Sequence, residues 1–234
     1  MNNLLVSPTI NFSKNLCVFD LGLVDFKEAY NLQKKIFLKV KENAHDPTLI
    51  LCQHHPVITI GRQGVREDVL VGYRELIKRK IPIFDIERGG KVTYHGPGQL
   101  LIYPIINLNY FNRDIHLFLR WLEELIIKIL NRFSIIARNY KGSTGVWVED
   151  KKIASIGIAI RNWITFHGLS INIKTHDLEN FSLIRPCGMN LIMTSMEEVL
   201  NKNISIEDVK RVAFSLIKGD YNDEGNLAGI GGRN

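Results

Sequence analysis

The chain has 234 residues, of which 45% are hydrophobic and 23% are charged, and its formal net charge is +6 at pH 7. This is the balance of an ordinary globular protein with one sizeable core. No apolar run approaches the roughly 18 residues of a membrane-spanning helix, and residues 1–14 lack the basic block and apolar core of a secretory signal. We therefore expect a cytoplasmic protein that does not bind a membrane.

The positive charge favours acidic partners, either nucleic acids or acidic proteins. Many of the basic residues are scattered through predicted helices, for example in the ranges 34–41 and 74–80. They are not interleaved with aromatic residues in the way that a base-stacking surface requires. Solvated helix faces explain this charge better, so no nucleic-acid partner is expected.

The first half of the chain alternates predicted helices and strands. Asp25, with Glu28 three residues later, is expected to cap the first helix. Pro56 is expected to interrupt the two strands that follow, because it cannot donate to a ladder. In chain order, the predicted elements are a helix over 25–42, strands over 48–53 and 57–60, a helix over 67–80, and strands over 82–87 and 100–108.

The second half begins with the longest predicted helix, over 114–133, which carries a wide apolar stripe. A last helix over 206–218 is expected to be capped by Ser205 and closed by Gly219. Between the two helices we expect four short strands, the last three forming an antiparallel meander, over 134–138, 146–149, 153–160 and 163–173.

This irregular alternation predicts the fold class. It is typical of an α+β fold with a mixed β-sheet flanked by helices, and not of a doubly wound sheet. No linker or repeat divides the chain, so a single domain is expected over 1–219. The Asn- and Gly-rich residues 220–234 are expected to form a disordered tail.

A glycine-rich segment over 88–100 stands out in the sequence. Four glycines and one proline fall within these thirteen residues, together with Arg, Lys, Thr, Tyr, His and Gln side chains. Glycine permits unusual backbone conformations and lets a ligand approach the backbone closely. The mixture predicts a binding loop; the alternative is a glycine-rich connection between two core strands.

The three cysteines, an odd number without a secretory signal, indicate free thiols in a reducing compartment. Cys17 and Cys52 fall in apolar runs and are expected to be small buried strand residues. Cys187 differs because it lies in a Pro/Gly turn beside an arginine. A loop thiol next to a basic group is a candidate nucleophile, although its position alone also fits an incidental loop cysteine.

Several kinds of site are not supported. The sequence has no phosphate-binding P-loop, no dinucleotide fingerprint and no pair of cysteines at metal-binding spacing. His54 and His55 are adjacent and would point to opposite faces of a strand, so each is expected to be structural. We therefore expect no metal and no cofactor.

Lys152 is the second candidate for chemistry. It opens an apolar strand directly after a turn, so its side chain is expected to be partly desolvated. Burial makes an amine a more usable base, and a neighbouring ammonium stabilises a thiolate. A dyad of Cys187 and Lys152 is therefore physically coherent. The sequence does not show that the two meet, and a solvated hairpin lysine remains the alternative.

Five blocks of the sequence, in this order, resemble the LipB-type octanoyltransferases of lipoate biosynthesis, also called lipoyl(octanoyl) transferases. That family resembles the biotin and lipoate protein ligases, whose catalytic domain is a mixed sheet flanked by helices. The departures are minor: Ser170 stands where alanine is frequent in the family, and the Asn/Gly-rich tail has no counterpart. The blocks are residues 55–62, 88–104, 145–157, 167–172 and 186–195.

The resemblance implies roles for individual residues. Cys187 would carry the acyl group as a thioester, and Lys152 would activate the thiol. Backbone N–H groups near Gly188 or the Gly89-Gly90 turn are candidates to stabilise the oxyanion. Acyl-substrate binding is implied for Arg88, Gly89, Gly90, Lys91, Val92, Thr93, Tyr94, His95, Ser155, Ile156, Gly157, Gly168, Leu169 and Ser170.

The implied reaction moves an octanoyl group from octanoyl-acyl carrier protein to a lysine of a lipoyl-domain protein, the first step of endogenous protein lipoylation. The implied acceptors are the lipoyl domains of 2-oxoacid dehydrogenase complexes and the glycine cleavage H protein. One alternative is an ATP-dependent lipoate-protein ligase of the same fold, against which the thiol and the 93–99 run argue. Another is a non-catalytic module that binds acyl carrier protein.

Overall fold

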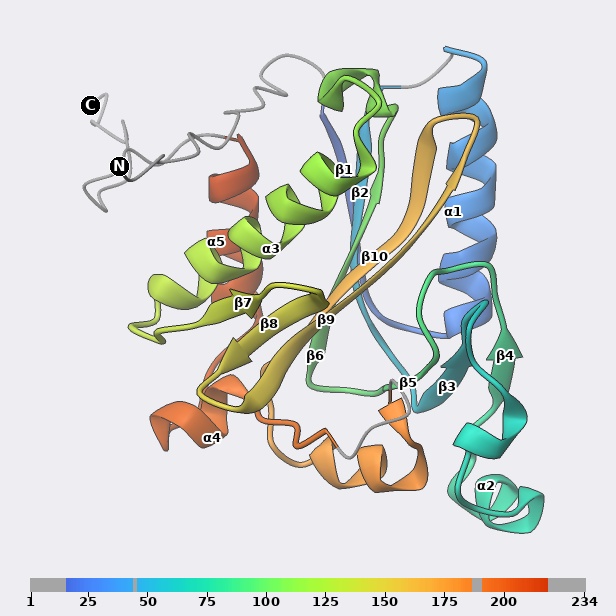
Figure 1. The fold of residues 1–234 in the computed structure, drawn as a ribbon, viewed down its shortest axis with the longest axis vertical. Coiled ribbons are helices and arrows are strands. Elements are labelled where there is room, and N and C mark those ends of the chain that lie inside the picture. The colour runs from blue at the N-terminus through green and yellow to red at the C-terminus, as the bar shows by residue number, and fades with distance from the viewer. Residues whose placement is uncertain (1–15, 44–45, 187–190, 219–234) are drawn as a thin grey trace, which may run out of the picture.

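The computed structural model describes residues 16–43, 46–186 and 191–218. Its centre is a mixed sheet of seven strands with helices on both faces (Figure 1). The first two strands of the sheet run parallel and the other neighbouring pairs are antiparallel. Across the sheet the strands are β1 (Cys17–Val24), β2 (Thr48–His54), β6 (Gln99–Ile105), β10 (Ile164–Asn172), β9 (Lys151–Arg161), β8 (Ser143–Val148) and β7 (Arg138–Tyr140).

A second sheet of three strands lies beside the first. Its order is β4 (Ile83–Asp85), β3 (Val57–Ile60) and β5 (Val92–His95). The chain leaves the large sheet at the end of β2 and enters the small one at β3, with Pro56 between them. The interruption expected at Pro56 is therefore confirmed, and it separates two sheets.

Three long helices cover the large sheet, α1 (Phe26–Lys41) on one face and α3 (Ile115–Asn131) with α5 (Ile206–Lys218) on the other (Figure 1). Successive strand residues point to opposite faces. In β2, Leu49 and Leu51 join the core beneath α3 and α5, whereas Ile50 and Cys52 join the core beneath α1. Alternation in the sequence thus builds a core on each face.

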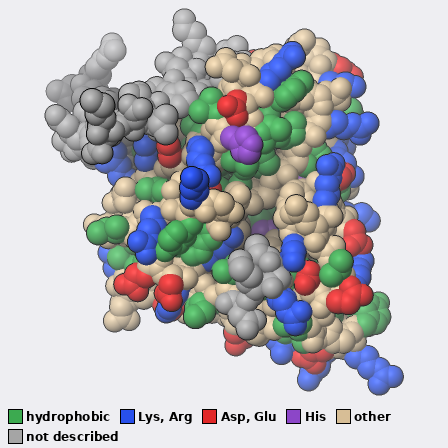
Figure 2. Space-filling view, in the orientation of Figure 1, with side chains coloured by type: hydrophobic (Ala, Val, Ile, Leu, Met, Phe, Trp, Pro, Cys, Tyr) green, Lys and Arg blue, Asp and Glu red, His purple; other side chains and the backbone are tan. Residues whose placement is uncertain are grey.

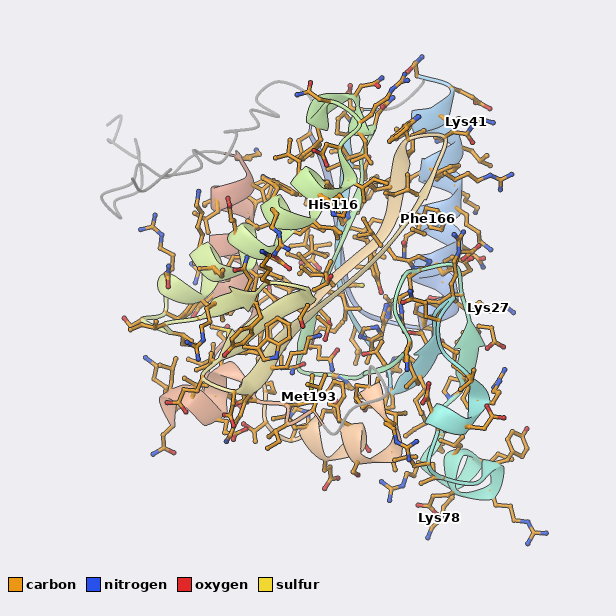
Figure 3. The ribbon with its side chains drawn as sticks, viewed as in Figure 1. Lys27, Lys41, Lys78, His116, Phe166 and Met193 are labelled. Carbon is orange, nitrogen blue, oxygen red and sulfur yellow. The ribbon has the colours of Figure 1, made fainter. Side chains whose placement is uncertain are left out.

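Figure 3 shows the α1 side of this arrangement, where Lys27 and Lys41 mark the two ends of the helix. Phe166 of β10 packs there against Phe37, with ring centroids 5.4 Å apart. The fold expected from the sequence, a mixed sheet flanked by helices, is confirmed. In the described part of the chain, none of the helices combines the length and the apolarity needed to cross a bilayer.

The prediction of a helix over 67–80 is wrong for the first half of that range. A short 3-10 helix, η1 (Arg66–Asp68), comes first, and the helix α2 (Tyr73–Arg79) begins only after Gly72. Between them Val69 forms a bridge to Ile184, and this pairing holds the backbone extended. Apolar spacing alone did not reveal the tertiary contact that interrupts the helix.

Two further local expectations are wrong. The chain does not form a strand over 134–138: Ile135 is buried and Ile136 is exposed, and the chain reaches the sheet edge only at Arg138. Asp25 stands at the start of α1, but its side chain makes no capping hydrogen bond. By contrast, Asp114 at the start of α3 accepts a hydrogen bond from the Leu117 N–H at 3.0 Å.

Three short elements were not expected from the sequence: the helix α4 (Met196–Leu200) and two 3-10 turns, η2 (Leu108–Phe111) and η3 (Leu178–Leu183). The start of α4 carried a recognisable signal, because Ser195 precedes Glu198 by three residues. The Ser195 hydroxyl accepts a hydrogen bond from the Glu198 N–H at 3.1 Å.

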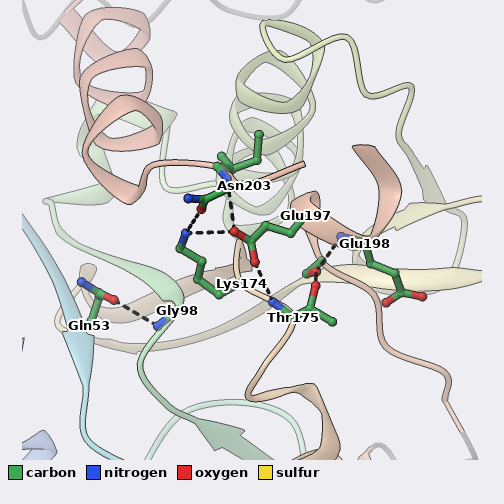
Figure 4. A network of polar contacts seen from close by, with 9 residues as sticks. Gln53, Gly98, Lys174, Thr175, Glu197, Glu198 and Asn203 are labelled. Atoms are coloured by element: carbon green, nitrogen blue, oxygen red, sulfur yellow. Dashed lines mark hydrogen bonds and ion pairs between the residues drawn. The ribbon is translucent and has the colours of Figure 1, made fainter. Parts of the chain in front are cut away.

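A polar network fixes α4 against the end of β10 (Figure 4). The Glu197 carboxylate accepts hydrogen bonds from the Lys174 ammonium at 2.9 Å and from the Thr175 N–H at 3.2 Å. The Thr175 and Ser195 hydroxyls lie 2.9 Å apart. The network anchors the segment that enters α4, and that segment runs alongside the first residues of β9.

Cys52 is fully buried, as expected, whereas Cys17 is only half-buried because β1 is an edge strand of the sheet. Helix α1 carries five lysines, and basic side chains also occur on other elements of the described part of the chain. Figure 2 shows Lys and Arg side chains spread over the visible face with Asp and Glu among them. Cys187, Gly219 and the tail over 220–234 lie outside the described residues.

Candidate active site

A cavity of about 490 Å³ opens between the small sheet and the middle strands of the large one. It is lined by strands β5, β6, β8, β9 and β10 together with the glycine-rich segment. The sequence-predicted residues that line this one cavity are Arg88, Gly89, Gly90, Lys91, Val92, Thr93, His95, Lys152, Ser155, Ile156, Gly157, Gly168, Leu169 and Ser170.

Tyr94 is the exception among the described candidates. It is fully buried beneath the small sheet, and its hydroxyl donates to Asp177 Oδ1 at 3.3 Å. Its ring packs edge-on against Phe181, with centroids 5.7 Å apart. Residues 92–95 form the strand β5, so Tyr94 points away from Thr93 and His95. Its position supports the small sheet and does not line the cavity.

The glycine-rich segment is a fixed structure held by the chain after β3. The N–H groups of Gly61, Arg62 and Gln63 donate to the carbonyls of Lys91, Arg88 and Gly90, at 2.9, 3.0 and 3.2 Å. Close approach explains the glycine at position 61, because a Cβ there would lie 2.4 Å from the Gly90 carbonyl oxygen. The segment is therefore ordered by its own backbone contacts.

The Gly89 N–H donates to the Ile158 carbonyl at 2.8 Å, so this group is engaged in joining the glycine-rich segment to β9. The expectation that it stabilises an oxyanion is accordingly weakened for Gly89. Gly188, the other candidate, lies outside the described residues.

Arg88 forms part of the wall and is folded back onto the small sheet. Its Nη2 donates to the Thr59 carbonyl at 2.7 Å, and its Nη1 donates to the Gly89 carbonyl at 2.9 Å. A Cβ at Gly157 would lie 3.0 Å from Arg88 Cδ, so β9 needs a glycine there to admit the arginine. The guanidinium brings a buried positive charge to the cavity wall.

Two buried histidines also line the cavity. His95 Nδ1 lies 3.0 Å from Gln99 Oε1, and burial lowers the pKa of His95 to about 3. Burial also lowers the pKa of His167, against the opposing effect of nearby Glu87. His167 has φ +56°, and its N–H donates to Gln33 Oε1 at 2.8 Å. Both imidazoles are neutral at physiological pH.

Glu87 stands beside His167, with 3.6 Å between Oε2 and Nε2, which is longer than a hydrogen bond. The Tyr30 hydroxyl donates to the same oxygen at 2.5 Å. The contact with His167 and then the Tyr30 hydrogen bond outweigh partial burial, and together they lower the pKa of Glu87 to about 2. A carboxylate therefore stands next to the cavity with its charge retained.

Lys152 is buried, with only 6% of its surface exposed, which confirms the predicted desolvation. Its ammonium donates to the Thr144 carbonyl at 3.1 Å and lies 4.9 Å from the centre of the Trp147 ring. Its backbone N–H donates to the Ile192 carbonyl at 2.8 Å, and its carbonyl accepts from the Thr194 N–H at 3.0 Å. These contacts fix both the backbone and the amine of Lys152 in the cavity wall.

The segment before α4 therefore runs alongside Lys152, because Met193, labelled in Figure 3, forms a bridge to Lys152. Cys187 itself lies outside the described residues, so its pairing with Lys152 stays a prediction. Pro186 and Leu191, which stand on either side of residues 187–190, both line the cavity.

Sequence reasoning did not identify several other residues that line the cavity. Among them are Phe26 of α1, Ile86 directly after β4, and Leu101 and Tyr103 of β6. These residues are ordinary members of apolar runs, and only the tertiary arrangement brings them together. His54, expected to be structural, is buried and lies 2.7 Å from the Tyr103 hydroxyl, while His55 is exposed.

The describable part of the chain contains no cluster of three His, Cys, Asp or Glu side chains arranged to hold a metal ion. The cavity instead combines an apolar wall, fixed backbone groups and one buried amine. Pockets of this kind, mainly apolar with a few placed polar groups, are typical of small-molecule sites.

Comparisons with known proteins agree with this arrangement. Residues 25–217 match the model of the lipoyl protein ligase A/B catalytic domain. The octanoyltransferase of Caldanaerobacter subterraneus subsp. tengcongensis is 46% identical over 193 residues, which cover 82% of this chain and 84% of that protein. The octanoyltransferase of Thermoanaerobacter sp. (strain X514) is 47% identical over 194 residues, with the same coverage.

The fold is similar to that of solved lipoate ligases. A bi-partite lipoate protein ligase of Thermoplasma acidophilum, described with its E2 lipoyl domain, matches with a TM-score of 0.66 at 17% identity. The match covers 88% of this chain and 83% of that one.

The chain belongs to the lipoyl protein ligase A/B catalytic domain family. Within that family its curated relatives are octanoyltransferases, which are acyltransferases.

Proposed function

We propose that this chain is an octanoyltransferase that moves an octanoyl group from octanoyl-acyl carrier protein to a lysine of a lipoyl domain through a thioester on Cys187. The observation that carries the proposal is the buried amine of Lys152. It lies in the wall of the cavity that Pro186 and Leu191 also line, on either side of the segment that holds Cys187.

In the first step, the Lys152 amine takes the proton of the Cys187 thiol, and the thiolate attacks the carbonyl carbon of the donor thioester. A new carbon–sulfur bond forms as the oxyanion develops. When the oxyanion collapses, the bond to the carrier sulfur breaks. The leaving thiolate takes the proton from the Lys152 ammonium, so the step ends with an acyl-enzyme and a free carrier thiol.

In the second step, the neutral amine of the acceptor lysine attacks the Cys187 thioester. A carbon–nitrogen bond forms, the carbon–sulfur bond breaks, and the proton lost by the attacking amine returns through Lys152 to the Cys187 thiolate. Transfer of the acyl group to the lysine needs no further activation step, because a thioester is already an activated acyl group.

The acyl chain would lie along the apolar part of the cavity. Ile156 and Leu169 line it from the neighbouring strands β9 and β10, and Leu101 and Tyr103 line it from β6. Gly157 and Gly168 keep the neighbouring backbones close, because a Cβ at Gly168 would lie 2.0 Å from the Ile102 carbonyl oxygen. A hydrocarbon chain gains free energy by leaving water for such a surface.

The proposed acceptors are lipoyl-domain proteins. The fold relative from Thermoplasma acidophilum is described together with an E2 lipoyl domain, which supports this class of acceptor. The finer assignment, to lipoyl domains of 2-oxoacid dehydrogenase complexes and to the glycine cleavage H protein, belongs to the same proposal. The acyl carrier protein donor and a single catalytic domain over residues 1–219 are also parts of this proposal.

An ATP-dependent lipoate-protein ligase is the second candidate, because solved lipoate ligases share the fold. A ligase activates a free acid as an adenylate and does not need a thiol. The higher identity of the octanoyltransferase relatives, 46% and 47%, favours transfer from a thioester.

Intact-protein mass spectrometry separates the two functions. The wild-type chain is mixed with octanoyl-acyl carrier protein without ATP, beside Cys187→Ser and Lys152→Ala. A hydroxylamine-labile octanoyl adduct on the wild type, absent from Cys187→Ser, is expected. An unmodified wild type that transfers octanoate only when free acid and ATP are supplied would establish the ligase instead.

A further inference from the structure

One peptide unit connects Lys152 to a buried carboxylate on α3. The carbonyl of the Thr144–Gly145 peptide accepts a hydrogen bond from Lys152 Nζ at 3.1 Å. The N–H of the same peptide donates to Glu123 Oε1 at 3.2 Å. Because both groups belong to one planar unit, the orientation of the carbonyl follows the orientation of the N–H.

Glu123 is an unusual residue in its surroundings. Only 1% of it is exposed, and it lies on the face of α3 that packs against the sheet. A buried carboxylate is costly unless its oxygens are hydrogen-bonded or paired. Its second oxygen, Oε2, pairs with Arg120 on the same helix and accepts a hydrogen bond from Asn139 Nδ2 at 2.9 Å.

The peptide is confined on its other side by Lys152. Gly145 has φ +136°, and a Cβ there would lie 2.6 Å from Lys152 Cε. The peptide therefore lies between the carboxylate and the amine, in contact with both. Arg120 and Asn139 hold the carboxylate, the carboxylate holds the peptide, and the peptide carbonyl holds Lys152.

We propose that Glu123 is a positioning residue for Lys152 and acts through the Thr144–Gly145 peptide. The inference rests on the proposed function in one respect, namely that Lys152 moves the protons of acyl transfer. Glu123 does not touch the acyl group, since it does not line the cavity. Its effect is to aim the carbonyl at the amine and to add a negative charge behind it.

The negative charge has a definite consequence for proton transfer. A carboxylate and an aligned carbonyl both favour the ammonium form of a nearby lysine over the neutral amine. Removing the charge while keeping the side-chain shape would favour the neutral amine, so Lys152 would titrate at lower pH. The direction of this shift distinguishes an electrostatic role from simple support of the fold.

The titration of Lys152 also depends on the other charged groups around it, and these must stay the same in the variants that are compared. The strand β8 contributes no ionisable side chain, and α3 contributes Arg120 besides Glu123. Lys151 points outward and pairs with Glu198 of α4 at 2.9 Å. Among the described residues, the ionisable groups that line the cavity with Lys152 are Arg88, Lys91, His95, Tyr103, Tyr140 and His167.

The titration of Lys152 tests the proposal directly. Chains labelled with carbon-13 at the lysine ε-carbon are made in the Cys187→Ser background, and the Lys152 resonance is assigned with Lys152→Arg. We expect Glu123→Gln to lower the titration midpoint of Lys152 by about one pH unit, the order of effect of one charge in a partly buried site. Glu124→Gln, at the next position of α3, is the matched control and should leave the midpoint unchanged.

The rate of acylation gives the second readout. With Cys187 present, Glu123→Gln is expected to reduce the single-turnover rate of adduct formation about tenfold or more, as loss of positioning does. The half-saturating concentration of octanoyl-acyl carrier protein should stay unchanged. An unshifted Lys152 midpoint with a wild-type acylation rate would overturn the proposal.

Two outcomes are kept apart. If the wild type forms no adduct on Cys187, the proposed function fails, while the Lys152 titration still decides the coupling to Glu123. If Glu123→Gln does not fold by circular dichroism, Glu123→Asp carries the test, because it keeps the charge and withdraws it by one methylene. A smaller shift in the same direction supports the proposal, and an unchanged midpoint contradicts it.

Discussion

Gly145 lies directly against the side chain of Lys152, so that a Cβ at position 145 would stand 2.6 Å from Lys152 Cε and 3.1 Å from its Nζ. The φ of Gly145, +136°, is also one that other residues rarely adopt. The glycine at this position is therefore required by the lysine beside it and by its own backbone conformation within β8.

We predict that Gly145→Ala displaces the Lys152 amine and lowers the acylation rate about a hundredfold, as a shift of about 1 Å in a reacting group does. Pre-steady-state adduct formation measures the rate. Gly72→Ala is the control, because a Cβ at Gly72 meets nothing within 4 Å. Equal rates for Gly145→Ala and the wild type would show that Lys152 is not held by this contact.

A second glycine supports the binding segment. We predict that Gly61→Ala destabilises the chain by about 1–3 kcal/mol, the range of overpacked sites, because two backbone carbonyl oxygens and the Arg88 side chain surround the added methyl. The nearest is the Gly90 carbonyl oxygen at 2.4 Å. Urea denaturation measures the change. The KM for octanoyl-acyl carrier protein should rise in the same variant, and a stable variant with normal KM would show that the segment can relax at no cost.

The buried histidines make stability depend on pH. Burial lowers the pKa of His54 to about 4, and the hydrogen bond that His54 Nδ1 donates to the Val24 carbonyl opposes this only in part. An unfolded histidine has a pKa of about 6.5, so the unfolded state binds more protons between about pH 4 and 6.5. Stability contributed by neutral His54 is present above that window and is lost as the pH falls through it.

We therefore predict that the free energy of unfolding falls by about 2 kcal/mol between pH 7 and pH 5 because of His54 alone. His54→Gln should show a shallower decline than the wild type over the same interval. Glu87, with its pKa near 2, contributes below about pH 4.5 and so does not produce this change. Identical slopes for the two chains would contradict the burial of a neutral imidazole at position 54.

The thiols should differ in reactivity. Cys52 is fully buried, and burial raises the pKa of its thiol well above the ordinary value. Because the thiolate is the reactive form, we expect iodoacetamide at pH 8 to leave Cys52 unmodified in the folded chain. Peptide mapping reads the labelled positions. Cys52→Ala should form the octanoyl adduct at the wild-type rate. A loss of acylation in that variant would show that the assignment of the nucleophile to Cys187 is wrong.

The sequence predicted the elements whose pattern is local. The apolar stripe of α3 and the turns that flank β9 identified α3, β9 and β10 to within a few residues. The helix expected over 67–80 was wrong because Val69 pairs with Ile184, more than a hundred residues away in the chain. Contacts of this kind leave no periodic signal.

The site shows the same division. Glycines, Lys152 and the resemblance marked fourteen of the 31 residues that line the cavity, because residues of a motif can be recognised in the sequence. Tyr94 belonged to the same motif but points away, since alternation within β5 decides its direction. Glu123 had no signal, because its role depends on a hydrogen bond to Gly145, across 22 positions of the chain.

The central claim is that the Cys187 thioester is an intermediate and not a side product, and a chase experiment tests it most directly. The acyl-enzyme made with carbon-14 octanoyl-acyl carrier protein is purified away from donor and mixed with an unmodified lipoyl domain without ATP. The account predicts that the label leaves the chain and appears on the lipoyl domain as a hydroxylamine-stable amide. Label that stays on the chain, or is released as free octanoate, would contradict it.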